Sequence, residues 1–329
     1  MVMTKGLFWK GRKVLVTGGA GFIGYALATK LAAAGARVFV LDIKKSLPPF
    51  PLGDTDVRKK ITYIRGDVTS NVTVGKVLEQ KRIKTVFHLA AEAIVERAHK
   101  NTVCALETNV LGTWTVLESA RYTRHLGEVI VASSDKAYGS HDKLPYQEHA
   151  SLKGLHPYDC SKSCADLVAQ MYGKTHALPV AVVRCGNVYG PGDTNWSRLI
   201  PDAFRCIATG STLKIRSDGT FKRDYVYIDD AVSAYMTLAE HVVKNRLSGE
   251  AFNFGNNKPL RVIDVLRDIS RVAPQLKFKI LNTAHSEIKH QYLDSSKAHR
   301  VLSWRARVGI REGLNKTCEW YAEYFSRRS

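Results

Sequence analysis

Short runs of β-branched and other apolar residues alternate with helix-like segments through the first half of this chain. Six such runs cover residues 13–18, 37–42, 61–67, 84–90, 129–134 and 179–184. The segments between them with a helical pattern cover residues 22–34, 71–80, 101–121 and 158–176. Alternation of this kind is typical of parallel βαβ units, because each return to a parallel strand needs a crossover helix. It predicts an α/β fold with a doubly wound parallel sheet.

The character of the sequence changes after Arg184. Turn signals become frequent in residues 186–224, and residues 247–329 mix short strands with helices. The chain has 329 residues, which is long for a single hydrophobic core. The predicted domains are a first domain over 1–183, to which 225–246 return, and a smaller C-terminal α/β lobe over 184–224 and 247–329.

Basic residues outnumber acidic ones, with 49 Lys and Arg against 30 Asp and Glu, so the formal net charge is +19. Such a charge favours anionic partners. The basic residues are spread along the whole chain, however, and no DNA- or RNA-binding motif is apparent, so we expect no nucleic acid. No window approaches 18 uncharged apolar residues, and residues 1–13 lack the apolar core of a signal peptide. We expect a cytoplasmic protein with no membrane span.

Cysteine and histidine spacing gives no sign of a metal site. The six cysteines include no CxxC pair, and the histidines lack metal-ligand spacing with Cys or Asp. We therefore predict reduced thiols and no bound metal.

A glycine-rich turn follows the first predicted strand and opens the first predicted helix. In "VTGGAGFIG", Gly18, Gly21 and Gly24 form a close variant of the dinucleotide-binding fingerprint. Glycines let the backbone approach a pyrophosphate, and the helix N-terminus supplies N–H donors. Asp42 ends the next strand, where its carboxylate would bind the adenosine ribose hydroxyls and repel a 2′-phosphate. The pattern predicts a Rossmann domain that binds NAD rather than NADP.

Further cofactor contacts are expected where the other strands of this domain end. The segment 66–68 could contact the adenine, and the segment 89–92 could line the nicotinamide ribose. The complete set of additional candidates for cofactor binding is Phe22, Ile23, Ile43, Asp67, Val68, Leu89, Ala90, Ala91 and Asn109.

Tyr158 and Lys162 lie four residues apart at the start of a predicted helix and therefore share one face. A lysine ammonium beside a phenol favours the phenolate and lowers the tyrosine pKa. Such a phenolate can take a proton from a substrate hydroxyl while hydride leaves the same carbon for NAD. Ser134 ends the fifth predicted strand, at the edge where parallel sheets place their chemistry. The three residues predict a redox site.

These motifs together resemble the extended short-chain dehydrogenase/reductase family, in its branch of nucleotide-sugar epimerases and dehydratases. The segments 107–120, 184–193 and 223–232 also resemble that family. The resemblance implies that Ser134 binds the C4 hydroxyl of the sugar, that Tyr158 is its base and that Lys162 holds the nicotinamide ribose. It implies further that the C-terminal lobe binds the sugar nucleotide and that helices 101–121 and 158–176 form a homodimer interface. The substrate-binding residues expected from it are Glu92, Asn187, Arg198 and Arg223, with Asn187 and Arg223 at the diphosphate.

The residues directly after Ser134 distinguish branches of this family. Ser134-Asp135-Lys136 is similar to the S-D-K of CDP-glucose 4,6-dehydratases. In that chemistry Lys136 would remove the C5 proton of a 4-keto sugar, and Asp135 would protonate the departing C6 oxygen. Lys136 must then be neutral, although the usual lysine pKa is about 10.4. Two alternatives stay open: a 4-epimerase, in which Asp135 and Lys136 are a solvated pair, and a non-catalytic NAD-binding scaffold.

Overall fold

The computed structural model describes residues 7–48, 55–283 and 287–328. We predicted no signal peptide in residues 1–13, and residues 1–6 of that segment lie outside the described residues. The chain forms two compact units. Unit 1 comprises Met1–Gly139, Ser151–Arg184 and Val232–Phe252, and unit 2 comprises Ser140–Ala150, Cys185–Ala231 and Asn253–Ser329.

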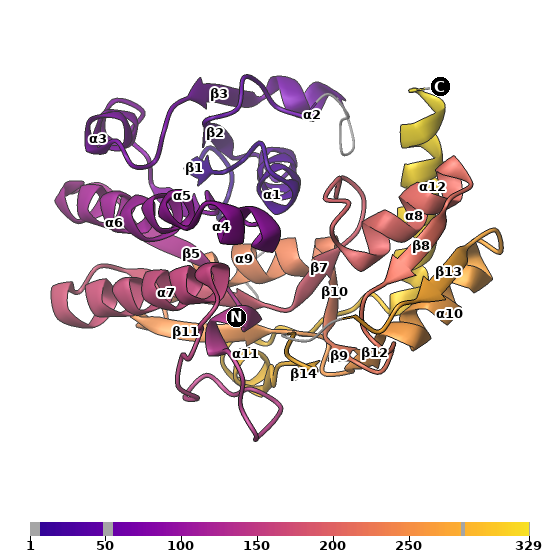
Figure 1. Ribbon diagram of the computed structural model, residues 1–329. Coiled ribbons are helices and arrows are strands. Elements are labelled where there is room, and N and C mark those ends of the chain that lie inside the picture. Colours follow the sequence, from indigo (N-terminus) through magenta and orange to yellow (C-terminus); the bar gives the residue numbers. More distant parts are fainter. Residues whose placement is uncertain (1–6, 49–54, 284–286, 329) are drawn as a thin grey trace. The chain divides into compact units, whose positions relative to one another are not determined.

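Unit 1 is built on a mostly parallel, seven-stranded sheet with the strand order β11-β6-β5-β4-β1-β2-β3 (Figure 1). Strand β1 pairs in parallel with β2 on one side and with β4 on the other, and the pairs β2–β3 and β4–β5 are parallel too. The chain thus crosses to the other side of β1 after β3, which creates the switch point at which such sheets bind ligands. The strands are β1 (Lys13–Thr17), β2 (Arg37–Asp42), β3 (Ile61–Arg65), β4 (Thr85–His88), β5 (Glu128–Ser134), β6 (Val180–Cys185) and β11 (Glu250–Phe254).

Both faces of this sheet are buried. Leu15 and Val129 belong to a core cluster that includes Val77 and Val116 from the covering helices. On the opposite face, Phe87 of β4 packs edge-on against Tyr235, with ring centroids 6.5 Å apart. Burial on both faces explains the near-continuous apolar runs of the sequence. The helices of this unit are α1 (Phe22–Ala33), α2 (Thr55–Lys59), α3 (Asn71–Gln80), α4 (Val95–Lys100), α5 (Thr102–Leu106), α6 (Gly112–Tyr122), α7 (Pro157–His176) and most of α9 (Ile228–Val242).

The predicted strands and helices of unit 1 are confirmed to within a few residues. The segment 101–121 is helical from Thr102 to Tyr122, as expected, but its middle turn is a π-helix, η1 (Glu107–Leu111), between α5 and α6. Asn101 has a non-helical backbone (φ −136°, ψ 79°), and its side chain caps α5 by accepting a hydrogen bond from the Cys104 N–H. The π-turn follows at Glu107 and closes when Gly112 N–H donates to the Glu107 carbonyl.

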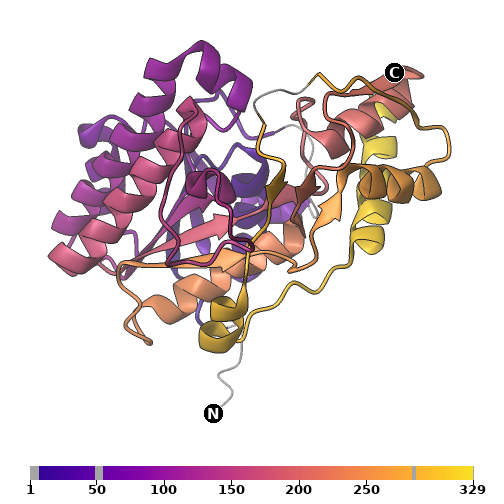
Figure 2. The same cartoon turned by 60° about the horizontal axis from the view of Figure 1, so that its bottom comes forward.

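Unit 2 consists of small sheets and helices. Helix α10 (Val262–Val272) packs against α12 (Ile310–Ser326), and Figure 2 shows the two helices crossing. An aromatic cluster fixes α12 to α8 (Leu199–Thr209), since Phe204 and Tyr321 stack with ring centroids 5.1 Å apart. The remaining elements are β7 (Asn187–Tyr189), β8 (Thr212–Ile215), β9 (Lys222–Arg223), β10 (Tyr225–Tyr227), β12 (Leu260–Arg261), β13 (Lys277–Ile280), β14 (His290–Gln291) and α11 (Ser296–Leu302). No helix in the described residues is long and apolar enough to cross a membrane.

Candidate active site

The turn between β1 and α1 leaves no room for side chains at two of its glycines. Gly18 has φ +68°, and a Cβ there would lie 2.6 Å from the Ala90 backbone nitrogen. A Cβ on Gly24 would lie 2.3 Å from the carbonyl oxygen of Gly18. Both distances are shorter than any real carbon contact, so only glycine allows this turn to lie against the end of β4.

Gly21 is less crowded than Gly18 and Gly24, because a Cβ there would meet a single atom. It is the N-cap of α1, and a Cβ there would meet only the Gly18 carbonyl oxygen, at 3.1 Å. The N–H groups of Phe22 and Ile23 in the first helical turn have no acceptor within the helix. An open cradle above a helix N-terminus fits the pyrophosphate of a dinucleotide.

Asp42 lies at the end of β2, beside this turn, and is only 8% exposed. One carboxylate oxygen accepts a hydrogen bond from the Ala20 N–H at 2.9 Å, and the other accepts from the Lys44 N–H at 3.0 Å. The Lys44 ammonium donates to the Ala20 carbonyl at 2.9 Å. The carboxylate is therefore fixed in place, and each of its oxygens retains a lone pair that can accept from a ribose hydroxyl.

The other predicted cofactor residues follow strand ends of the same sheet. Asp67 and Val68 follow β3, and Asp67 accepts a hydrogen bond from the Thr69 N–H at 2.9 Å. Leu89, Ala90 and Ala91 follow β4, directly beside the glycine turn. Ile43 follows β2 and is 65% exposed. The topology thus brings these residues to the carboxyl edge of the sheet.

Helix α7 carries Tyr158 and Lys162, which are 9% and 7% exposed. The Lys162 ammonium donates to the Ala132 carbonyl of β5 at 2.9 Å. Burial lowers the pKa of Lys162 to about 8, although the nearby Asp166 carboxylate opposes this shift. Asp166 is itself held by Arg184, which donates to both of its oxygens at 2.8 Å. Helix α7 is thus anchored to β5 and β6 through buried charges.

The end of β5 turns directly into a short 3-10 helix, η2 (Asp135–Tyr138), which Ser134 caps. The Ser134 hydroxyl accepts from the Lys136 N–H at 3.2 Å and donates to the Asp135 carboxylate at 3.0 Å. Asp135 is 2% exposed, whereas Lys136 is half-buried. The 4-epimerase alternative assumed that Asp135 and Lys136 are a solvated pair. The burial of Asp135 shows that the pair is not fully solvated.

Asp159 is a residue of this site that sequence reasoning missed. It lies on α7 next to Tyr158 and is 6% exposed. Burial raises the pKa of its carboxyl, the positive charge of Lys136 opposes that shift, and the negative charge of Asp135 adds to it. A buried acid coupled to two candidate catalytic groups is typical of an active site. An acid in the first turn of a helix carries no such signal in sequence, because it also suits the helix dipole.

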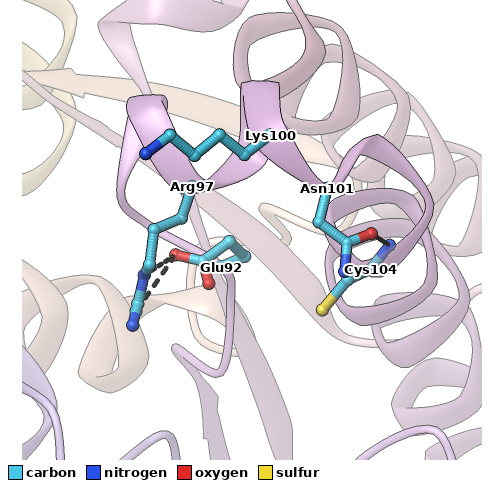
Figure 3. Close-up of a pocket in the computed structure, with 5 residues that line it drawn as sticks. All are labelled: Glu92, Arg97, Lys100, Asn101 and Cys104. Carbon is cyan, nitrogen blue, oxygen red and sulfur yellow. Dashed lines mark hydrogen bonds and ion pairs between the residues drawn. The ribbon is translucent and has the colours of Figure 1, made fainter.

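Glu92 and Asn109 lie together beyond the end of β4. The Asn109 side chain is 1% exposed; its oxygen accepts from the Glu92 N–H at 2.7 Å, and its nitrogen donates to the Ser161 hydroxyl at 2.8 Å. The Glu92 carboxylate accepts from the Ile94 N–H at 3.0 Å and pairs with Arg97 at 3.2 Å (Figure 3). A cavity of about 240 Å³ adjoins this pair and is lined by Glu92, Arg97, Lys100, Asn101 and Cys104.

The remaining predicted substrate residues are in unit 2. The Asn187 backbone N–H donates at 2.8 Å to the carbonyl of Asp224, the residue that follows Arg223 at the end of β9. The Arg223 guanidinium donates to the carbonyls of Lys222 and Lys289, each at 2.9 Å. Arg198 pairs with the buried Asp193 carboxylate at 2.9 Å. In the described part of the chain, no group of three or more His, Cys, Asp or Glu side chains could hold a metal ion.

Comparison with known proteins shows the family to which this chain belongs. The profile of the NAD dependent epimerase/dehydratase family matches residues 14–255. The trifunctional UDP-glucose 4,6-dehydratase/UDP-4-keto-6-deoxy-D-glucose 3,5-epimerase/UDP-4-keto-L-rhamnose-reductase of Arabidopsis thaliana is 29% identical over 96% of this chain. The chain spans about half the length of that relative, 48%. A probable dTDP-glucose 4,6-dehydratase of Sinorhizobium fredii is 30% identical, with 94% of this chain and 93% of the relative covered. A CDP-glucose 4,6-dehydratase of Salmonella typhimurium is 27% identical, over 95% and 91%.

Solved structures agree with this result. An epimerase of Methanothermobacter thermautotrophicus superimposes with a TM-score of 0.90 at 28% identity, covering 99% of this chain and 97% of the other. The dTDP-glucose 4,6-dehydratase of Streptomyces venezuelae, solved with NAD bound, gives a TM-score of 0.85 at 29% identity, covering 96% and 98%. The predicted Rossmann-like fold and the predicted cofactor, NAD, are confirmed.

Proposed function

Because the chain belongs to the NAD dependent epimerase/dehydratase family, we propose that it is a nucleotide-diphosphate-hexose 4,6-dehydratase. It would convert NDP-glucose into NDP-4-keto-6-deoxyglucose. The observation that carries this proposal is a group of charged residues directly beyond Ser134. Asp135 is buried, and the charges of Asp135 and Lys136 both act on the buried Asp159. Oxidation at C4 alone needs no such charged cluster. Relatives named as 4,6-dehydratases support the proposal.

The glycine turn, the N-terminus of α1, Asp42 and Lys162 are the residues that would hold NAD. Bound NAD supplies the hydride acceptor for oxidation at C4 and the hydride donor for reduction at C6. The fixed Asp42 carboxylate would orient the adenosine ribose, and Lys162 would orient the nicotinamide ribose.

Tyr158 and Ser134 act on the C4 hydroxyl. The Tyr158 phenolate removes the hydroxyl proton, and Ser134 binds the same oxygen. The positive charge of Lys162, one helical turn from Tyr158, stabilises the phenolate. Because the pKa of Lys162 is lowered to about 8, this stabilisation is lost as the pH rises through that value.

Lys136 and Asp135 carry out the elimination. The 4-ketone acidifies the C5 hydrogen, and Lys136, after it has given up its own proton, removes this hydrogen as a proton. The Asp135 carboxyl donates a proton to the C6 oxygen, so that the C6–O bond breaks, water leaves and a C5–C6 double bond forms. Elimination therefore leaves Lys136 positive and Asp135 negative, and Lys136 gives a proton to C5 as C6 is reduced. Tyr158 then loses the C4 proton to solvent and Asp135 regains one, so the starting protonation states are restored.

We further propose that Asn187 and Arg223 of unit 2 bind the diphosphate of the substrate and that Arg198 is another substrate-binding residue. We also propose a homodimer through α6 and α7, which pack against each other and expose Trp114, Leu167 and Met171, at 53%, 55% and 41%. Light scattering tests the dimer. Replacing Trp114 and Leu167 with glutamate shifts the expected dimer to a monomer without loss of the fold.

Incubation with a panel of CDP-, dTDP-, UDP- and GDP-glucose tests the function. The proposal predicts a 4-keto-6-deoxy sugar from at least one of them, identified by NMR. A 4-epimerase is the second candidate, because an epimerase structure superimposes over almost the whole chain. It would instead interconvert gluco and galacto nucleotides and keep the C6 oxygen. Failure to turn over any sugar nucleotide while binding NAD would favour a scaffold.

A further inference from the structure

A buried histidine lies between the cofactor turn and the catalytic helix. His88, the last residue of β4, is 2% exposed. Its Nδ1 lies 2.8 Å from the Thr17 hydroxyl at the end of β1, and its Nε2 lies 3.0 Å from the Thr113 hydroxyl of α6. Both threonines are as deeply buried as the histidine. Each ring nitrogen thus has one partner, and no solvent reaches the ring.

The direction of each hydrogen bond follows from the hydroxyl protons. The Thr113 hydroxyl donates its single proton to the Asn109 carbonyl at 2.6 Å. It can therefore only accept from His88, so the ring hydrogen is on Nε2. Nδ1 must then accept from Thr17, whose oxygen accepts in turn from the Ala90 N–H at 3.3 Å. One neutral tautomer satisfies every group.

The same chain of hydrogen bonds continues to the catalytic tyrosine. Asn109 donates from its side-chain nitrogen to the Ser161 hydroxyl, and Ser161 donates to the Tyr158 carbonyl at 2.7 Å. Ser161 is fully buried. A continuous path therefore runs from the end of β1 through β4 and the π-helix to the first turn of α7.

Protonation of His88 would break this path. A second ring hydrogen, on Nδ1, would face the Thr17 hydroxyl, which already donates in that direction. It would also place a cation near the Lys162 ammonium. Burial first, and then the Lys162 charge, lower the pKa of His88 to about 3.

We propose that His88 is a positioning residue, a neutral imidazole that holds the glycine turn and the Tyr158 segment in register through Thr17, Thr113 and Asn109. Its buried ring would act through these side chains and not on the substrate itself. The predicted effect on kcat rests on the proposed function, whereas the predicted tautomer of His88 does not.

The tautomer is measured by ¹⁵N NMR of the histidine rings in the NAD-bound protein, with His88→Gln identifying the signal. The expected result is a neutral ring with hydrogen on Nε2 over about pH 5 to 8, the range in which ordinary histidines titrate. A ring with hydrogen on Nδ1, or one that titrates in this range, overturns the proposal whether or not the protein is a dehydratase.

Variants of Thr113 test the positioning itself. Thr113→Val keeps the shape and removes the hydroxyl, and it should lower kcat about tenfold with KM unchanged. Thr113→Ser restores the hydroxyl and should recover most of that loss. Thr115→Val, at another buried threonine of α6, is the matched control and should remain near wild type. Equal losses in Thr113→Val and Thr113→Ser, or no loss in either, contradict the proposal. If no sugar nucleotide is turned over, the proposed function fails while the NMR result still decides the tautomer.

Discussion

The two strand ends that form this site are built in different ways. At the end of β1 the backbone shapes the site, because Gly18 lets the turn approach Ala90, Gly24 lets α1 approach Gly18, and Gly21 places no side chain at the start of α1. At the end of β5 side chains shape it, because the Ser134 hydroxyl donates to the Asp135 carboxylate and the Lys162 ammonium donates to the Ala132 carbonyl, both at partly buried positions. The shape of the β1 end depends on positions that have no side chain. The chemistry of the β5 end depends on which polar and charged side chains lie together. The β1 end should therefore respond to added volume, and the β5 end to changes of a single polar atom.

The largest effect is expected from removing one oxygen at the β5 end. Tyr158→Phe should lower kcat about a thousandfold, because it removes the base for the C4 hydroxyl. Tyr172→Phe is a matched control on the same helix, since it removes a phenol hydroxyl that bonds to Glu118 at 2.7 Å. Steady-state kinetics measures both variants. Comparable activity in the two would show that the phenol of Tyr158 has no special role.

Asp135→Asn should separate the two halves of the reaction. The amide keeps the shape but cannot give a proton to the C6 oxygen, so we expect about a hundredfold slower formation of the 6-deoxy product. Oxidation at C4 should persist and be visible as absorbance of reduced cofactor during a single turnover. Loss of both steps together would mean that Asp135 maintains the site instead of serving as the acid.

The β1 end is tested by adding one methyl group. Gly24→Ala should weaken NAD binding at least about tenfold and destabilise the protein, because its Cβ would lie 2.3 Å from the Gly18 oxygen. Gly75→Ala is the control: no atom lies within 4 Å of a Cβ there, so α3 should gain about 0.5–1 kcal/mol. Calorimetric titration with NAD and thermal unfolding check both variants. Equal NAD affinity in the two would contradict a backbone-shaped cofactor site.

The smallest effect concerns stability and charge. The native protein raises the pKa of Asp159 above the usual 3.8, so ionising this carboxyl destabilises the fold. Both folded and unfolded chains hold the proton below about pH 3.8, and the cost appears as the pH rises above that value. Asp159→Asn should therefore unfold at higher denaturant concentration than wild type at pH 7, with the gain shrinking towards pH 4. A variant that is less stable at pH 7 would contradict this sign.

The sequence predicted the part of the site that depends on local pattern. Strand ends, the glycine turn, Asp42 and the shared helix face of Tyr158 and Lys162 all follow from spacing and periodicity, and the structure places them as expected. A residue that directly follows a parallel strand lies at the carboxyl edge of the sheet, and this placement can be predicted without knowing any long-range contact.

Contacts between distant segments could not be predicted in this way. The π-turn within helix 101–121 contains the buried Asn109, and nothing in a single helical pattern indicates this turn. His88 appears in the sequence only as the end of an apolar strand, and Asp159 only as an acid in a first helical turn. Their environments depend on Thr113, Lys136 and Asp135 from other segments, which only the folded chain brings together.

Hydrogen exchange at C5 tests the central claim most directly. The wild-type protein is incubated with its NDP-glucose in heavy water, and the product is analysed by NMR. The account predicts an NDP-4-keto-6-deoxy sugar with one deuterium at C5, because the proton that Lys136 removes is replaced from solvent. A mixture of gluco and galacto nucleotides that retains the C6 oxygen and carries no deuterium at C5 would contradict it.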